Sequence, residues 1–186
     1  MSNKIANYTA FYVSEPFSQS NLGAYATPDF IYYQQLCSWK GQDSSFPFID
    51  AHKSTYNVRD DSSWETLKIR LHERLRGSKN IILFLSNNTK NSRALREEIE
   101  YGINSIGLPI IVVYPDYTEM SSIASNTGIK SNIMRLWSNL PVFSNNMHKV
   151  PTLHIPYKKE IIRKALLDTN FMAPFMINSA KLYYYI

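Results

Sequence analysis

Continuous apolar runs alternate with amphipathic segments along this chain. The runs at 80–85 and 109–115 are hydrophobic at nearly every position, which is typical of strands buried on both faces of a sheet. An aromatic-rich run at 8–13 and shorter runs at 46–51 and 150–155 favour further strands. The pattern therefore predicts a sheet built from these segments.

Apolar residues recur between the runs with the 3.6-residue period of a helix. Thr27 and Pro28 start a predicted helix over 29–39, and Ser62 with Glu65 has the spacing of a capping box for a helix that ends at Gly77. Further helices are predicted in the second half of 86–107, around 132–137 and at 157–167. Strands that alternate with helices favour parallel pairing. We expect a three-layer α/β fold with a central, mostly parallel five-stranded sheet.

One helix carries three acids with unequal surroundings. Apolar residues form a stripe along it, at Leu95, Ile99, Ile103 and Ile106. At about 100° per residue, Glu97 and Glu100 point away from this stripe towards water, whereas Glu98 lies at its edge, roughly 80° from the centre. Acids early in a helix often only offset the helix dipole. A carboxylate at the stripe's edge can instead be half buried, and Glu98 is therefore the candidate catalytic acid.

Composition limits the other possibilities. The length of 186 residues suits one domain, which we place at 1–168, followed by an aromatic tail at 169–186 that packs on the domain or on a partner. The single cysteine, Cys37, suits a reducing cytoplasm, and no apolar run is long enough to span a membrane. The net charge of +5 comes partly from basic residues on polar helix faces, with no nucleic-acid-binding motif beside them. We therefore expect a cytoplasmic protein that binds neither nucleic acid nor membrane.

Polar residues follow several of the predicted strands. In an open parallel sheet, ligands bind outside the carboxyl ends of the strands. These ends carry Ser14 and Phe17, Asp50, and Ser86, and Glu98 lies on the helix that follows Ser86. The chain lacks glycine-rich phosphate loops and metal-ligand spacing of histidines, so we expect no metal and no cofactor. Each serine and Asp50 can equally serve only to cap a turn.

These segments resemble a known family. The strand YTAFYVS ends in a serine, as the opening strand of Toll/interleukin-1 receptor (TIR) domains does, and the TIR fold is flavodoxin-like. The block IILFLSNNTKNSRALREEI is similar to the TIR pattern of a strand, a serine, and then S-x-W-C-x-x-E-L, with Glu98 at the glutamate position and Ala94-Leu95 in place of Trp-Cys. The aspartate in FPFIDA resembles that of the TIR-like proteins of bacterial Thoeris antiphage systems.

The resemblance implies an enzyme that cleaves NAD+ at the nicotinamide–ribose bond. Glu98 would be catalytic, and the substrate, NAD+, would contact Ser14, Phe17, Asp50, Ser86 and Leu95. It also implies self-association on activation and an ADP-ribose-derived, typically cyclic, nucleotide that activates a downstream antiphage effector. Two alternatives stay open: a non-catalytic TIR-like interaction scaffold, and a nucleoside deoxyribosyltransferase-like enzyme with a carboxylate nucleophile.

Overall fold

A five-stranded sheet forms the centre of the protein in a computed structural model that describes residues 4–13, 29–52, 63–173, 175 and 179–185. The strand order is β1-β2-β3-β6-β7, and every neighbouring pair is parallel. The strands are β1 Ala6–Ala10, β2 Ser78–Phe84, β3 Ile110–Tyr114, β6 Thr152–Pro156 and β7 Leu182–Tyr184. The predicted three-layer α/β fold with a parallel five-stranded sheet is confirmed.

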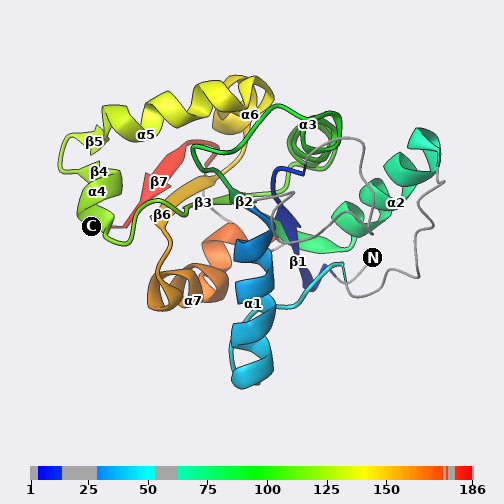
Figure 1. Cartoon of the computed structure of the whole chain (residues 1–186), viewed down its shortest axis with the longest axis horizontal. Helices are drawn as coiled ribbons and strands as arrows, with labels where there is room; N and C mark the ends of the chain where they lie inside the picture. Colours follow the sequence, from blue (N-terminus) through cyan, green and yellow to red (C-terminus); the bar gives the residue numbers. More distant parts are fainter. Residues whose placement is uncertain (1–3, 14–28, 53–62, 174, 176–178, 186) are drawn as a thin grey trace.

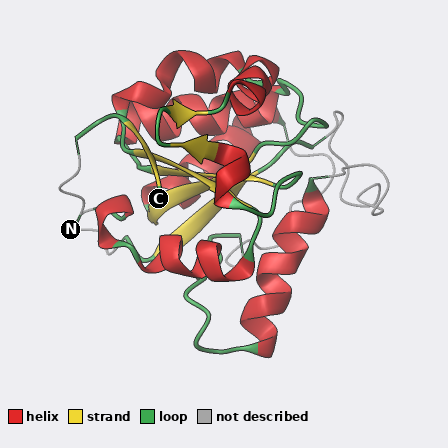
Figure 2. Cartoon of the chain, turned by 90° about the vertical axis from the view of Figure 1, so that its left-hand side faces the viewer, coloured by secondary structure: helices red, strands yellow, loops and turns green. Residues whose placement is uncertain are grey.

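Helices cover both faces of this sheet (Figures 1 and 2). One face packs against α1 Phe30–Gln42 and α7 Lys159–Leu167. The other packs against α2 Trp64–Arg76, α3 Arg93–Glu100, α5 Ser131–Leu136 and α6 Pro141–Asn146. Alternate residues of β2 divide between the two cores: Ile81 and Leu83 face α2 and α3, and Ile82 and Phe84 face α1 and α7.

Shorter elements complete the chain. The helix α3 continues as a π-helical segment, η2 Tyr101–Ile106, and the region 116–149 is more regular than the sequence indicates. It contains α4 Met120–Ile123, a small hairpin of β4 Ala124–Ser125 and β5 Gly128–Ile129, and the 3₁₀ turns η3 Trp137–Asn139 and η4 Met147–Lys149. A further 3₁₀ turn, η5 Thr169–Phe171, follows α7. No helix within the described ranges combines the length and apolar character needed to cross a bilayer.

The predicted strand at 46–51 is wrong, although the segment lies where a strand was expected. It forms a single parallel bridge, between Asn7 and Asp50, at the free side of β1. Pro47 lacks a backbone donor, and the N–H of Ile49 is bound at 2.9 Å by the Asn7 side chain instead of by a strand carbonyl. The fifth strand of the sheet is instead β7, from the aromatic tail, which pairs with β6.

Helix starts also differ in detail from those predicted. The N-cap of α2 is Ser63, not Ser62, and its hydroxyl accepts a hydrogen bond from the N–H of Thr66 at 3.3 Å. The N-cap of α1 is Asp29, whose side chain does not cap the helix, and Thr27 lies outside the described residues. Adjacent residues differ little in energy as the first residue of a helix, so predicted helix ends commonly differ from observed ones by one or two residues.

Two buried asparagines connect the amino-terminal ends of the strands to the C-terminal segment. Asn7 donates to Asn80 at 2.8 Å, and Asn80 donates to the carbonyl of Phe171 at 3.0 Å. The N–H of Ala173 also donates to the carbonyl of Lys79 at 2.7 Å. Residues after 168 therefore contribute to the core and the sheet, while the proposed division of the chain at 168 stays a prediction.

We expect Asn80→Ala to lower the free energy of unfolding by about 1–3 kcal/mol, because it leaves the Asn7 amide and the Phe171 carbonyl buried without partners. Urea denaturation measures this change. The exposed Asn126 is the matched control, and Asn126→Ala should lie within about 0.5 kcal/mol of the wild type. Equal stability of the two variants would show that the asparagine pair is not needed.

Candidate functional site

Glu98 is the buried acid of α3. The helix begins at Ser92, whose hydroxyl accepts a hydrogen bond from the N–H of Leu95 at 3.3 Å. Glu98 is 9% exposed, so it is more buried than its predicted position at the edge of the stripe indicates, whereas Glu100 is exposed as expected. Glu97 does not point freely into water, because α2 lies beside it and supplies partners.

Glu97 forms ion-pair contacts with the neighbouring helix. Its Oε1 lies 2.8 Å from His72 Nε2 and 3.4 Å from Lys68 Nζ. His72 in turn stacks flat on the ring of Tyr101, with ring centroids 3.5 Å apart. These contacts fix α3 against α2 and thereby set the direction in which Glu98, the next residue, points.

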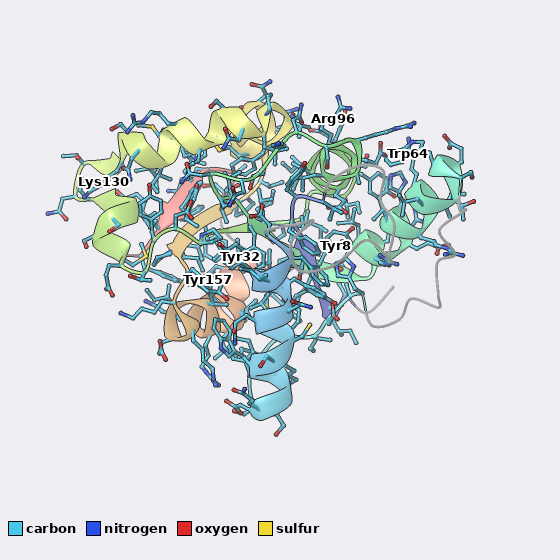
Figure 3. The ribbon with its side chains drawn as sticks, viewed as in Figure 1. Tyr8, Tyr32, Trp64, Arg96, Lys130 and Tyr157 are labelled. Atoms are coloured by element: carbon cyan, nitrogen blue, oxygen red, sulfur yellow. The ribbon has the colours of Figure 1, made fainter. Side chains whose placement is uncertain are left out.

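Tyr8 and Arg74 are the polar neighbours of Glu98. Tyr8 lies on β1, on the face that packs against α2 and α3 (Figure 3). Its hydroxyl is fully buried close to the Glu98 carboxyl, but it makes no hydrogen bond of ordinary geometry within the described part of the chain. The Arg74 guanidinium, from α2, acts electrostatically on both groups. Among the described residues, the carboxyl therefore has Tyr8 as a potential donor and Arg74 as a cation that acts on it.

His52 borders the same cluster. Its ring lies 5.0 Å from the Tyr8 ring, between centroids, and its Nδ1 is 3.3 Å from Arg74 Nη1. An arginine can only donate, so Nδ1 accepts, and Nε2 carries the proton that is donated to the Thr9 carbonyl at 2.9 Å. Burial and the charge of Arg74 both lower the pKa of His52, in agreement with this neutral tautomer.

Burial dominates the ionisation of Glu98. It raises the pKa of the Glu98 carboxyl to about 8, while the Tyr8 hydroxyl and the Arg74 charge oppose this rise. Burial and the charge of Glu98 also raise the pKa of Tyr8 well above its ordinary value. Near neutral pH the carboxyl is therefore mostly protonated, and a cation placed beside it would favour its ionised form.

Asp50 lies at the sheet edge and turns towards α1. Its Oδ2 accepts a hydrogen bond from Tyr33 Oη at 2.8 Å, and its Oδ1 accepts one from the N–H of His52 at 2.9 Å. The Tyr33 ring also lies 5.5 Å from the His52 ring. Asp50 is thus connected to the Glu98 cluster through His52, and its predicted contact with a substrate stays a prediction.

Ser86 is bound within a buried network at the carboxyl end of β2. Its hydroxyl donates to Asp29 Oδ1 at 2.7 Å, and the hydroxyl of Thr89 donates to Asp29 Oδ2 at 2.9 Å. Burial raises the pKa of Asp29, and both hydroxyls oppose that rise. The hydroxyl of Ser86 therefore anchors the loop between β2 and α3, and its predicted contact with a substrate stays untested.

The other predicted substrate contacts are less informative. The Leu95 side chain is 1% exposed and packs in the core beneath α3, which leaves its predicted role as a prediction. Ser14 and Phe17 lie outside the described residues. No group of three or more His, Cys, Asp and Glu side chains within the described ranges is arranged to hold a metal ion.

Sequence patterns missed several members of this cluster. Tyr8 belongs to an apolar strand, and Arg74 belongs to a basic helix that looks merely solvated. Asp29 stands where a helix start predicts a cap. Only long-range contacts distinguish these residues, because the Tyr8 strand, the Arg74 helix and the Glu98 helix are distant in sequence. Two local signals pointed to the site: the helical period of α3 and the Ser-to-Glu spacing after β2.

A comparison with protein families agrees with the motif. Residues 8–120 match the family described as Thoeris protein ThsB, TIR-like domain. A crystal structure of a conserved protein from Enterococcus faecalis V583 is similar with a TM-score of 0.44 and 12% identity, over 87% of this chain and 98% of that one. The family match spans β1 to the start of α4 and includes Tyr8, Arg74 and Glu98. The chain therefore belongs to the TIR-like domain family of the Thoeris protein ThsB.

Proposed function

We propose that this protein cleaves NAD+ at the bond between nicotinamide and ribose, with Glu98 as the catalytic carboxylate. The observation that carries the proposal is that the glutamate of the family motif is the buried acid of α3, beside Tyr8 and Arg74. Its two neighbouring acids are instead paired on the surface or exposed. The family membership makes NAD+ the substrate most consistent with such a carboxylate.

The chemistry of the bond suits a buried carboxylate. The C1′–N bond breaks, and its electron pair leaves with nicotinamide, which becomes neutral. The ribose then carries positive charge as an oxocarbenium-like state, and an ionised Glu98 would stabilise it. Attack at C1′ by water, with loss of one proton, gives ADP-ribose. Attack by a nucleophile elsewhere in the same molecule gives a cyclic product instead.

The same site offers a route to ionise Glu98. The pyridinium ring of NAD+ is positively charged, and its approach to a buried carboxyl would lower the pKa of that carboxyl. The substrate itself would thus generate the charged form that the reaction requires. In a Thoeris setting the product would serve as the nucleotide signal that activates a separate antiphage effector.

We expect purified protein, once assembled or triggered, to release nicotinamide from NAD+, and Glu98→Gln to lower this rate about a hundred-fold or more. Glutamine keeps the size of the side chain but cannot carry the charge. Nicotinamide release measured by chromatography, over a range of protein concentrations that includes assembled forms, provides the test. The matched control is Glu100→Gln, which alters an exposed acid of the same helix.

Three outcomes contradict parts of this proposal. A Glu98→Gln variant that consumes NAD+ at the wild-type rate would exclude Glu98 as the catalytic group. Base exchange on nucleosides without NAD+ cleavage would favour the deoxyribosyltransferase alternative. Protein that consumes neither substrate in any assembly state, yet self-associates or binds a partner, would favour the scaffold alternative.

The pH profile of the reaction gives a second test. Because kcat/KM reports ionisations of the free enzyme and Glu98 must be ionised, kcat/KM should rise about ten-fold per pH unit until it levels near the pKa of about 8. Initial rates at low NAD+ concentration measure this profile. A kcat/KM that already levels below about pH 6 would show that Glu98 ionises normally in the free protein.

Stability should report the same ionisation without any catalysis. The pKa of Glu98 is about 8 in the folded protein and 4.5 for a free side chain, so the folded state holds the proton more tightly. Folding stability from this group is therefore full below about pH 4.5 and falls by up to about 1.4 kcal/mol per pH unit as the pH rises towards 8. Glu98→Gln should remove this loss. Urea denaturation should therefore show that, between about pH 5 and pH 8.5, the free energy of unfolding of the variant rises relative to that of the wild type by a few kcal/mol. A difference between the two proteins that does not change with pH would contradict the buried carboxyl.

A further inference from the structure

The two flanks of α2 differ in how their basic side chains are partnered. On one side of its buried leucine stripe, Lys68 and His72 face Glu97 of α3. On the other side, Arg70 and Arg74 are four residues apart and lie on one flank of the helix. Neither arginine forms an ion pair within the described part of the chain. Glu97 thus pairs with one flank, and no acid among the described residues forms an ion pair with the other.

Arg70 is the less satisfied of the two arginines. Its Nη1 is shielded from water and makes no hydrogen bond with any described residue. A guanidinium N–H that has lost water without gaining an acceptor is unfavourable, and the charge of the group increases this cost. Arg74 donates to the neutral ring of His52, which leaves its charge uncompensated by that contact. The two guanidinium groups therefore have more N–H donors than there are acceptors around them among the described residues.

The direction of α2 places this flank towards the ligand-binding edge of the sheet. The helix ends at Arg76, and β2 starts at Ser78, so the C-terminal end of α2 lies at the amino end of the strand (Figure 1). Its N-terminal part points towards the carboxyl ends of the strands, where open parallel sheets bind ligands. Arg70 is one helical turn further in that direction than Arg74, whose charge acts on Glu98.

We propose that Arg70, together with Arg74, binds the pyrophosphate of a dinucleotide substrate. This inference rests on the proposed NAD+ cleavage and extends it to the other end of the ribose. The reacting carbon, C1′, and the 5′-phosphate belong to the same sugar, so the phosphates would lie close to Glu98. The arginine pair is on the neighbouring helix α2, and the charge of Arg74 already acts on Glu98. The planar fork of a guanidinium matches the oxygens of a phosphate group better than a lysine ammonium does.

The test uses ADP-ribose, which carries the pyrophosphate but has no nicotinamide to lose. Isothermal calorimetry on the full chain should show that Arg70→Met weakens ADP-ribose binding about ten-fold or more, the loss expected for charge-assisted hydrogen bonds. The affinity of Arg70→Lys for ADP-ribose should lie between those of the wild type and Arg70→Met. The matched control is Arg76→Met, which alters an exposed arginine of the same helix and should leave the affinity unchanged.

Two further measurements separate binding from a structural role. Nicotinamide riboside lacks phosphate, so its affinity should be the same in wild type and Arg70→Met. The melting temperature of Arg70→Met should equal or exceed that of the wild type, because the substitution removes an unpartnered buried N–H. A lower melting temperature with equal loss of both ligands would assign Arg70 to the fold and overturn the proposal.

The remaining outcomes distinguish this inference from the proposed function. Binding of ADP-ribose that depends on Arg70 supports the inference even if the protein does not turn over NAD+. Turnover of NAD+ with an Arg70→Met variant that binds ADP-ribose like the wild type overturns the inference alone. Failure of the wild-type protein to bind ADP-ribose at all also overturns it.

Discussion

Burial of the Glu98 carboxyl is the constraint around which this structure is arranged. A carboxylate held away from water at the junction of α3 and β1 is costly when ionised, and the fold therefore favours its protonated form. The same burial makes any charge that does form there more effective, because interactions strengthen in a low-dielectric site. Tyr8 and Arg74 moderate the cost without cancelling it. Ionisation of Glu98 therefore remains unfavourable in the free protein, and a suitable ligand could lower this cost.

The position of Glu98 depends on a second buried acid. Asp29 does not cap its own helix and instead accepts hydrogen bonds from Ser86 and Thr89, which lie at the start of the loop leading to α3. The N–H of Tyr12, after β1, donates to the same carboxylate. One side chain therefore joins the ends of β1 and β2 to the start of α1. The loop it holds is short, so the start of α3 at Ser92 is fixed as well.

Some helices and strands could be predicted from the pattern of their own residues alone. The apolar runs of β2 and β3, and the spacing of Leu95, Ile99 and Ile103 on α3, follow directly from burial on known faces. The edges of the sheet could not be predicted in this way. Whether 46–51 becomes a strand depends on the Asn7 side chain, and whether the aromatic tail joins the sheet depends on β6.

The residues of the candidate site likewise fall into those that could be predicted from local sequence and those that could not. Glu98 could be predicted because both the helical period and a short motif fall on it. Its neighbours could not, since Tyr8 and Arg74 are separated from it in sequence and have unremarkable local contexts. The expected solvent-facing role of Glu97 was wrong for the same reason: the His72 and Lys68 that bind it come from another helix.

The unbalanced groups on the two sides of the site are complementary to one molecule. The burial of the Glu98 carboxyl outweighs the charge of Arg74 that acts on it, and neither Arg70 nor Arg74 forms an ion pair with any described acid. A dinucleotide with a pyridinium at one end of a ribose and a pyrophosphate at the other carries both missing charges in the matching order. Each imbalance alone has an ordinary structural explanation, because buried acids and stray arginines occur in many folds. Their placement on the neighbouring helices α2 and α3, which flank the edge where such sheets bind ligands, is what the proposed substrate explains and a purely structural account does not.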